Sequence, residues 1–125
     1  MSTTLIPSTA FGTPTGNYDG SSTSFESDSA YGDGYYGYTD GLHTVSVQTT
    51  GFVGTITIQG SLAETPGTSD WFTVRDTSGA NLVYGDGSSA TTVSEAKNFI
   101  VNAVHVRAAV ASFSAGSIAK INFNH

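Results

Sequence analysis

Cysteine is absent from this chain of 125 residues, so neither a disulfide nor a thiolate metal site holds it together. No apolar run reaches the roughly 18 residues of a membrane-spanning helix, and we expect no membrane span. The first residues combine no basic region with an apolar run, so we also expect no signal peptide. A chain of this length predicts one globular unit with a modest core.

Charge is scarce as well. Charged residues make up 11% of the chain, with ten Asp and Glu against four Lys and Arg. So few cations cannot neutralise a run of phosphates, which argues against nucleic-acid binding. Residues 1–40 hold five of the acids and no Lys or Arg, which leaves residues 41–125 nearly neutral. A polar but weakly charged surface of this kind is more typical of adhesive or particle-forming β-proteins than of cytosolic enzymes.

Residues 42–125 alternate apolar and polar side chains with a period of two. The pattern is clearest over residues 55–62, where Ile56, Ile58 and Leu62 share one side of an extended chain. Comparable patterns predict strands over residues 43–48, 71–75, 81–84 and 91–93, a long strand over 99–113 that bends near 109, and a last strand after a turn at 114–116. Short strands separated by Gly- and Ser-rich turns predict an all-β antiparallel β-sandwich, jelly-roll or immunoglobulin-like.

The same alternation predicts which side chains form the core. Trp71 is expected to be mostly buried with Phe72 on the opposite face, and Ala119 is expected to point inward with its neighbours in the last strand. The expected core residues are Ile56, Ile58, Val104, Val106, Ile121 and Phe123.

Residues 1–41 lack this period and are rich in Gly, Ser and Thr. We predict an extended N-terminal arm and a Gly/Tyr-rich loop, distinct from a β-sandwich domain at 42–125. The loop carries five of the six tyrosines in a composition similar to that of an antibody paratope. An alternative is that the tyrosines fold back over the open end of the sandwich. The predicted protein interface consists of Phe11, Tyr18, Tyr31, Tyr35, Tyr36 and Tyr38.

No motif in the chain indicates catalysis. His43, His105 and His125 are far apart in sequence and share no metal-ligand spacing. Three aspartates that precede glycine lack the ligand alternation of a calcium loop: Asp19, Asp33 and Asp40. No Gly-x-Ser-x-Gly elbow accompanies the many serines. We therefore predict no catalytic residue, metal or cofactor, and leave open whether Trp71 is a core residue or, with the tyrosines, a sugar-stacking platform.

Several segments together carry a resemblance to a known group of proteins. They are Gly51-Phe52-x-Gly54 continuing through Leu62, Asp70-Trp71-Phe72-x-Val74, Asn98-Phe99, Val104-x-Val106-Arg107-Ala108 and Gly116-x-Ile118-x-x-Ile121. The pattern resembles small β-sandwich virion structural proteins of tailed bacteriophages, of the marine and cyanobacterial type, and covers about residues 42–125.

The resemblance implies a capsid decoration (cement) protein that is synthesised in the host cytoplasm and incorporated in the virion. Its partner would be the major capsid protein or another virion protein, with further copies of itself as lattice neighbours or in a homo-oligomer. The alternatives are a neck, tail or fibre component, and a carbohydrate- or receptor-binding module. The resemblance brings no catalytic residues.

Overall fold

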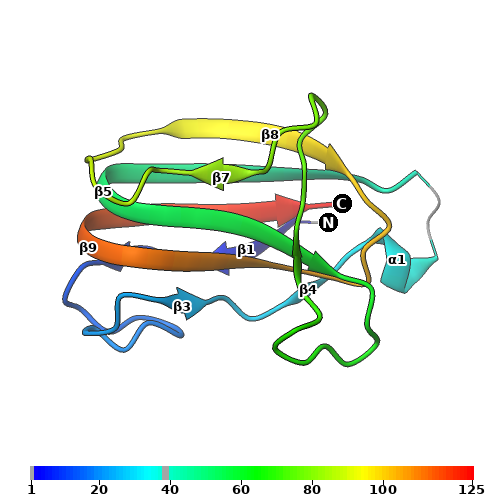
Figure 1. Ribbon diagram of the computed structural model, residues 1–125, viewed down its shortest axis with the longest axis horizontal. Helices are drawn as coiled ribbons and strands as arrows, with labels where there is room; N and C mark the ends of the chain where they lie inside the picture. Colours follow the sequence, from blue (N-terminus) through cyan, green and yellow to red (C-terminus); the bar gives the residue numbers. More distant parts are fainter. Residues whose placement is uncertain (1, 38–39) are drawn as a thin grey trace.

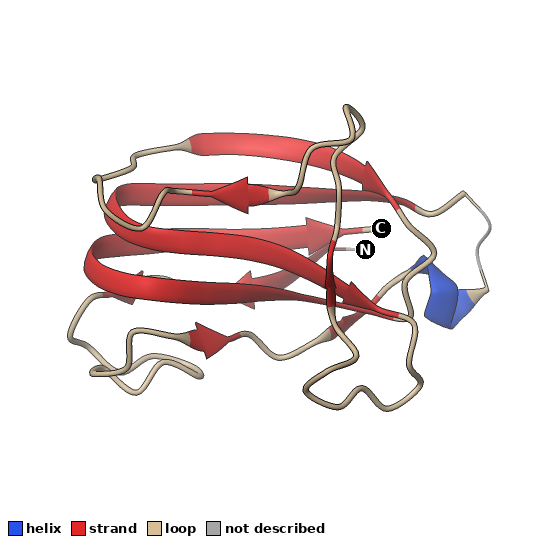
Figure 2. Ribbon diagram, in the orientation of Figure 1, coloured by secondary structure: helices blue, strands red, loops and turns tan. Residues whose placement is uncertain are grey.

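The computed structural model describes residues 2–37 and 40–125 as an almost entirely β structure (Figures 1 and 2). Its elements are β1 (Ser2–Ile6), β2 (Thr9–Ala10), β3 (Phe25–Glu26), β4 (Ala30–Tyr31), α1 (Asp33–Tyr36), β5 (Leu42–Ser61), β6 (Phe72–Thr73), β7 (Val83–Tyr84), β8 (Ser94–Ile100) and β9 (His105–Asn124). The strands pair antiparallel in one sheet. The all-β antiparallel class predicted from the sequence is confirmed, as one continuous sheet that curls on itself.

Two strands of 20 residues each, β5 and β9, form the centre of the sheet. They pair antiparallel along their length, from Thr44 opposite Asn124 to Ser61 opposite His105. Figure 1 shows both strands turning back at the same end of the molecule, opposite α1. The expected separate strands over 43–48 and 55–62 are therefore one strand, and the expected turn at 114–116 lies inside β9.

Glycine permits this bend. Gly51 in β5 and Gly116 in β9 have φ angles of 57° and 78°, a region that side-chain-bearing residues rarely adopt. The β5–β9 register also shifts between Thr50 and Val53 and again between Val53 and Thr55. Such bulges increase local twist and bend a strand without ending it. The ladder therefore continues through segments that read as turns in the sequence.

The bend brings both halves of the long strands around one apolar core. Val45 and Val47 from the first half of β5 join Ile56 and Ile58 from its second half in a single buried cluster. Of the expected core residues, Ile56, Ile58, Val106, Ile121 and Phe123 are at most 1% exposed, which confirms them.

Four expectations about the core and strands are wrong. Val104 is only half-buried, because β9 begins one residue later. Leu62 follows the end of β5 and is 66% exposed. Ala119 is exposed because the register shift between Gln48 and Thr49 makes it an extra residue in β9. Phe99 belongs to β8, separate from the strand that follows.

The remaining strand predictions need smaller corrections. β6 covers only two residues of the expected 71–75 strand, and Trp71 is half-buried rather than mostly buried. Phe72 is 37% exposed. The bend expected near Ala109 is absent, because Ala108 and Val110 are both buried and the inward alternation continues past it. The edge strand expected at 91–93 is instead β8, which pairs with the first half of β5.

The N-terminal segment is part of the same sheet. Strands β1, β2, β3 and β4 all pair with β9, and Leu5, Ile6, Tyr18 and Phe25 are buried in the core. Leu5 and Ile6 are consecutive yet both buried, because the β1–β9 register shifts between Thr4 and Ile6. Much of the segment predicted as an arm is thus ordered by contacts within its own chain. No helix among the described residues has the length and apolarity to cross a membrane.

Candidate functional site

Five of the six aromatic residues predicted to form one interface are among the described residues, and these five do not lie together. Phe11 is 46% exposed, and its backbone N–H donates to the carbonyl oxygen of Gly116, at the bend. Tyr18 is 1% exposed and packs against Phe25 and Phe113. Tyr18 is therefore a core residue, and its assignment to the predicted interface is wrong. Tyr38 lies outside the described residues.

Three of the predicted residues do form a cluster, which we call the tyrosine cluster: Tyr31, Tyr35 and Tyr36. Tyr31 and Tyr35 stack with ring centroids 3.7 Å apart, and Tyr36 stands edge-on to Tyr35 at 5.2 Å. Their exposed fractions are 46%, 52% and 45%. These three mutually packed, half-exposed rings belong to β4 and α1, and Figure 1 shows α1 at the end of the molecule opposite the bend.

The position of α1 explains how the cluster is held. The backbone N–H of Gly34 donates to the carbonyl oxygen of Ala103, and a Cβ at this glycine would collide with the carbonyl oxygen of Asn102. Tyr31, one residue before the turn into α1, pairs with His105, the first residue of β9. The helix is therefore fastened to the segment that leads into β9, and the tyrosine rings are presented on a fixed support.

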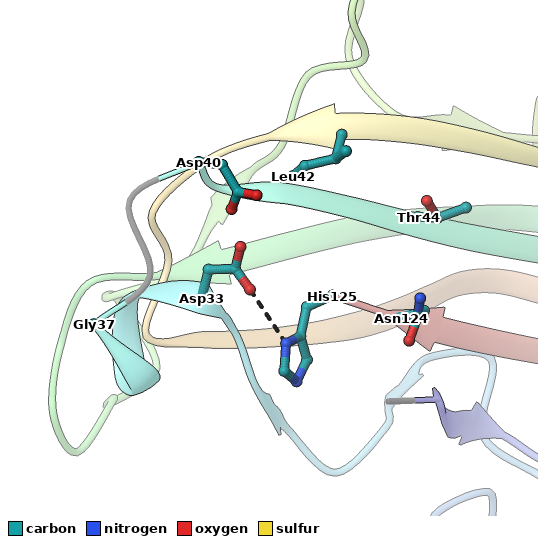
Figure 3. Close-up of a pocket in the computed structure, with 7 residues that line it drawn as sticks. All are labelled: Asp33, Gly37, Asp40, Leu42, Thr44, Asn124 and His125. Atoms are coloured by element: carbon teal, nitrogen blue, oxygen red, sulfur yellow. Dashed lines mark ion pairs between the residues drawn. The ribbon is translucent and has the colours of Figure 1, made fainter.

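The first residue of α1 carries a buried carboxylate. Asp33 is 2% exposed, and its Oδ1 is 3.2 Å from Nδ1 of His125 (Figure 3). His43, from the start of β5, accepts the backbone N–H of Asp33 at Nε2 over 3.1 Å. Because Nε2 accepts, the neutral ring carries its proton on Nδ1, which donates to the carbonyl oxygen of Gly41 at 2.6 Å. His43 therefore fixes α1 to the sheet as a neutral imidazole.

Burial shifts the titration of both groups. Desolvation lowers the pKa of His43, against the opposing attraction of Asp33. Desolvation also raises the pKa of Asp33, and a hydrogen bond with Asp40 acts in the same direction. The hollow lined by Asp33, Asp40 and His125 has a volume of about 720 Å³ and opens to solvent at the chain end.

Replacing His43 by Gln tests this account through pH. As pH falls below about 6.5, the unfolded chain takes up a proton at His43 and the folded chain does not, until its lowered pKa is reached. The stability of the wild type relative to His43→Gln should therefore decline below that pH, by about 1.4 kcal/mol for each unit by which the pKa is lowered. Denaturant unfolding at a series of pH values measures the difference.

The neighbouring titratable groups, Asp33, Asp40 and His125, are common to both proteins. The raised pKa of Asp33 affects stability in the opposite direction, because it lowers the stability of the fold as pH rises above 3.8. Both proteins contain Asp33, so taking the difference between their stabilities removes this effect to first order. If the difference in free energy of unfolding between the wild type and His43→Gln stays constant from pH 7.5 to 5, His43 is not a buried neutral imidazole.

The sequence missed the approach of His43 to His125, whose ring centroids are 6.5 Å apart. Antiparallel pairing places the start of β5 beside the end of β9, so His43 and His125 come close in space although they are far apart in sequence, whereas His105 packs against Tyr31. Asp19 accepts hydrogen bonds from the backbone N–H groups of Ser21 and Ser22, a local turn. Within residues 2–37 and 40–125, no group of three or more His, Asp or Glu is arranged to hold a metal ion.

Comparison of the chain with protein-family models, with curated proteins and with solved structures found no match.

Proposed function

We propose that this protein is a structural component of a tailed-phage virion, a head decoration (cement) protein that binds the major capsid shell. The tyrosine cluster is the structural observation that supports binding to another protein. Tyrosine is enriched at protein interfaces because its ring buries a large area while its hydroxyl stays hydrogen-bonded. A cluster held on a fixed support also loses little conformational entropy on binding.

The phage assignment itself rests on the sequence resemblance over residues 42–125, and the curled sheet is compatible with it. A capsid presents many identical sites, so a decoration protein gains avidity from repeated contacts even where each contact is modest. The low charge of the chain limits repulsion between copies crowded on such a lattice. Phe11, at the opposite end from the tyrosine cluster, is placed to contact a different neighbour.

Substituting Tyr35 by Ala tests the proposal. Tyr35 is the most exposed ring of the cluster, and truncating an aromatic hot-spot residue costs 2 kcal/mol or more, so we expect about 30-fold weaker binding. Binding is measured by co-sedimentation with phage heads that lack this protein and carry the major capsid protein. Val83→Ala, which changes an exposed apolar residue on β7, is the matched control.

Undiminished binding of Tyr35→Ala to heads would overturn the role of the cluster. Binding to isolated tails rather than heads would assign the protein to the neck, tail or fibre instead. Deletion of residues 2–17 is not a usable test, because it removes Leu5 and Ile6 from the core and would destabilise the fold itself.

A further inference from the structure

A second hollow lies beside the outward-facing residues of β9, away from the buried Asp33. It has a volume of about 350 Å³, which is within the range of small-ligand sites. One wall is formed by residues 27–29, between β3 and β4, and the other by residues 66–68 and Trp71, ahead of β6. Arg107 of β9 lies between the two walls. We call this hollow the Trp71 groove.

Arg107 is held in place within the groove. Its guanidinium carbon is 4.2 Å from the centroid of the Trp71 ring, and its Nε donates to Oε1 of Gln59 at 2.8 Å. The contact of the guanidinium with the Trp71 ring and the hydrogen bond from Nε together restrain the position of the side chain. Within the described residues, the terminal Nη groups make no hydrogen bond or ion pair. Arg107 therefore presents oriented donors whose partners are not supplied by the protein.

A carboxylate acceptor lines the same hollow, and a second carboxylate lies near Arg107. Asp28 lines the groove, and its Oδ1 accepts one hydrogen bond, from the Asn17 amide at 3.0 Å. Glu26 lies close enough to attract Arg107 electrostatically. No ion pair joins either carboxylate to Arg107 among the residues that the structure describes. The groove thus offers charged donors on Arg107 and a charged acceptor on Asp28.

This mixture restricts the chemistry of a ligand. A phosphate or carboxylate ligand would bind Arg107 but would be repelled by Glu26 and Asp28. An apolar ligand would leave these polar groups desolvated and unpaired. Each sugar hydroxyl both donates and accepts hydrogen bonds, so one saccharide unit can accept from Arg107 at one hydroxyl and donate to Asp28 from another. Trp71, half-buried at the groove wall, adds apolar surface against which the C–H groups of a sugar ring can pack.

We propose that the Trp71 groove binds a neutral saccharide unit of a glycan, with Arg107 as donor, Asp28 as acceptor and Trp71 as the apolar wall. This site is independent of the tyrosine cluster. A particle protein with such a groove would adhere to glycan surfaces as well as to its own shell.

The tryptophan provides the measurement. Trp71 is the single Trp of the chain, so emission excited at wavelengths that the six tyrosines do not absorb reports this groove. The full chain is titrated separately with maltose, cellobiose, lactose and chitobiose, and with a glucuronic-acid disaccharide as an acidic probe. A shallow site this small should bind with a Kd of about 1 mM, and we expect a saturable change in emission with at least one neutral disaccharide.

Substitutions in the groove test whether its side chains recognise the sugar. Because these substitutions also change the emission of Trp71, binding to the variants is measured by saturation-transfer NMR. Arg107→Lys keeps the charge but loses the planar fork, and Asp28→Asn loses the carboxylate. Each should weaken binding about tenfold or more. Arg75→Gln, which removes an exposed arginine bonded only to the Gly79 carbonyl among described residues, should leave binding unchanged.

No response to any neutral disaccharide at about 30 mM, well above the expected Kd, would overturn the proposal. Unchanged binding by Arg107→Lys and Asp28→Asn, both folded by circular dichroism, would also overturn it. A stronger response to the glucuronic-acid disaccharide would overturn the requirement for a neutral ligand.

Discussion

Replacing Gly116 by Ala should destabilise the fold by more than about 4 kcal/mol, a loss that few single substitutions produce. Gly116 lies at the bend of β9 with a φ of 78°, where an L side chain costs about 1–2 kcal/mol. A Cβ there would also collide with the carbonyl group of Gly51 and the backbone nitrogen of Phe52. These are backbone atoms of the paired strand, so they cannot move aside without breaking the ladder at the bend.

Gly51→Ala is the matched control. Gly51 lies across the same bend with a φ of 57°, but a Cβ there meets nothing within 4 Å. It should therefore cost only the conformational penalty, about 1–2 kcal/mol. Thermal and denaturant unfolding of both variants measure the difference, and failure of Gly116→Ala to accumulate as soluble protein agrees with the expectation. Equal losses for the two variants would show that the close approach at the bend does not matter.

The contrast between these glycines shows what a sequence conveys about such a bend. Glycine in a strand pattern signals a turn, a bulge or a close approach of backbones, and the residue itself does not distinguish them. The sequence pattern predicts a turn between two strands at residues 114–116, whereas β9 continues through them. The distinction depends on β5 bending at the same place, and pairing between residues about 60 positions apart leaves no local mark.

Regular alternation was predictable because it reflects a local geometric rule. Val45 and Val47, like Ile56 and Ile58, follow the period of two and are fully buried. Irregular positions were not predictable, because a single extra residue reverses every later side chain. Ala119 is such a residue, and the bulge that exposes it instead buries Ile118.

The N-terminal segment shows a second limit. Strands β2, β3 and β4 are two residues long, too short for any period to appear. Their order comes from pairing with β9, and Tyr18 and Phe25 become buried because a long neighbouring strand supplies the surface. Composition predicts a tyrosine-rich surface in this segment, but it gives no sign that Asp33 is buried. The contact of Asp33 with His125 requires the chain end to return beside α1.

Replacing Ile58 by Ala should cost about 2–4 kcal/mol, through lost burial and the cavity left behind. Ile58 is fully buried in the second half of β5. Its backbone N–H donates to the carbonyl oxygen of Leu82, and its carbonyl oxygen accepts from Val74, so the segment is fastened on the side away from β9 as well. The backbone is therefore poorly able to collapse into the space, which favours the upper part of that range.

Leu62→Ala is the control that distinguishes the effect of burial from the effect of a position in the apolar alternation. Alternation alone places Leu62 on the same side as Ile58, yet β5 ends at Ser61 and Leu62 is 66% exposed. Substitutions at exposed sites without special roles usually change stability by less than about 0.5 kcal/mol. Denaturant unfolding of the two variants should therefore give a clear shift in midpoint for Ile58→Ala and almost none for Leu62→Ala. Comparable losses would mean that β5 extends its buried face past Ser61, and the end of this strand would have to be reassigned.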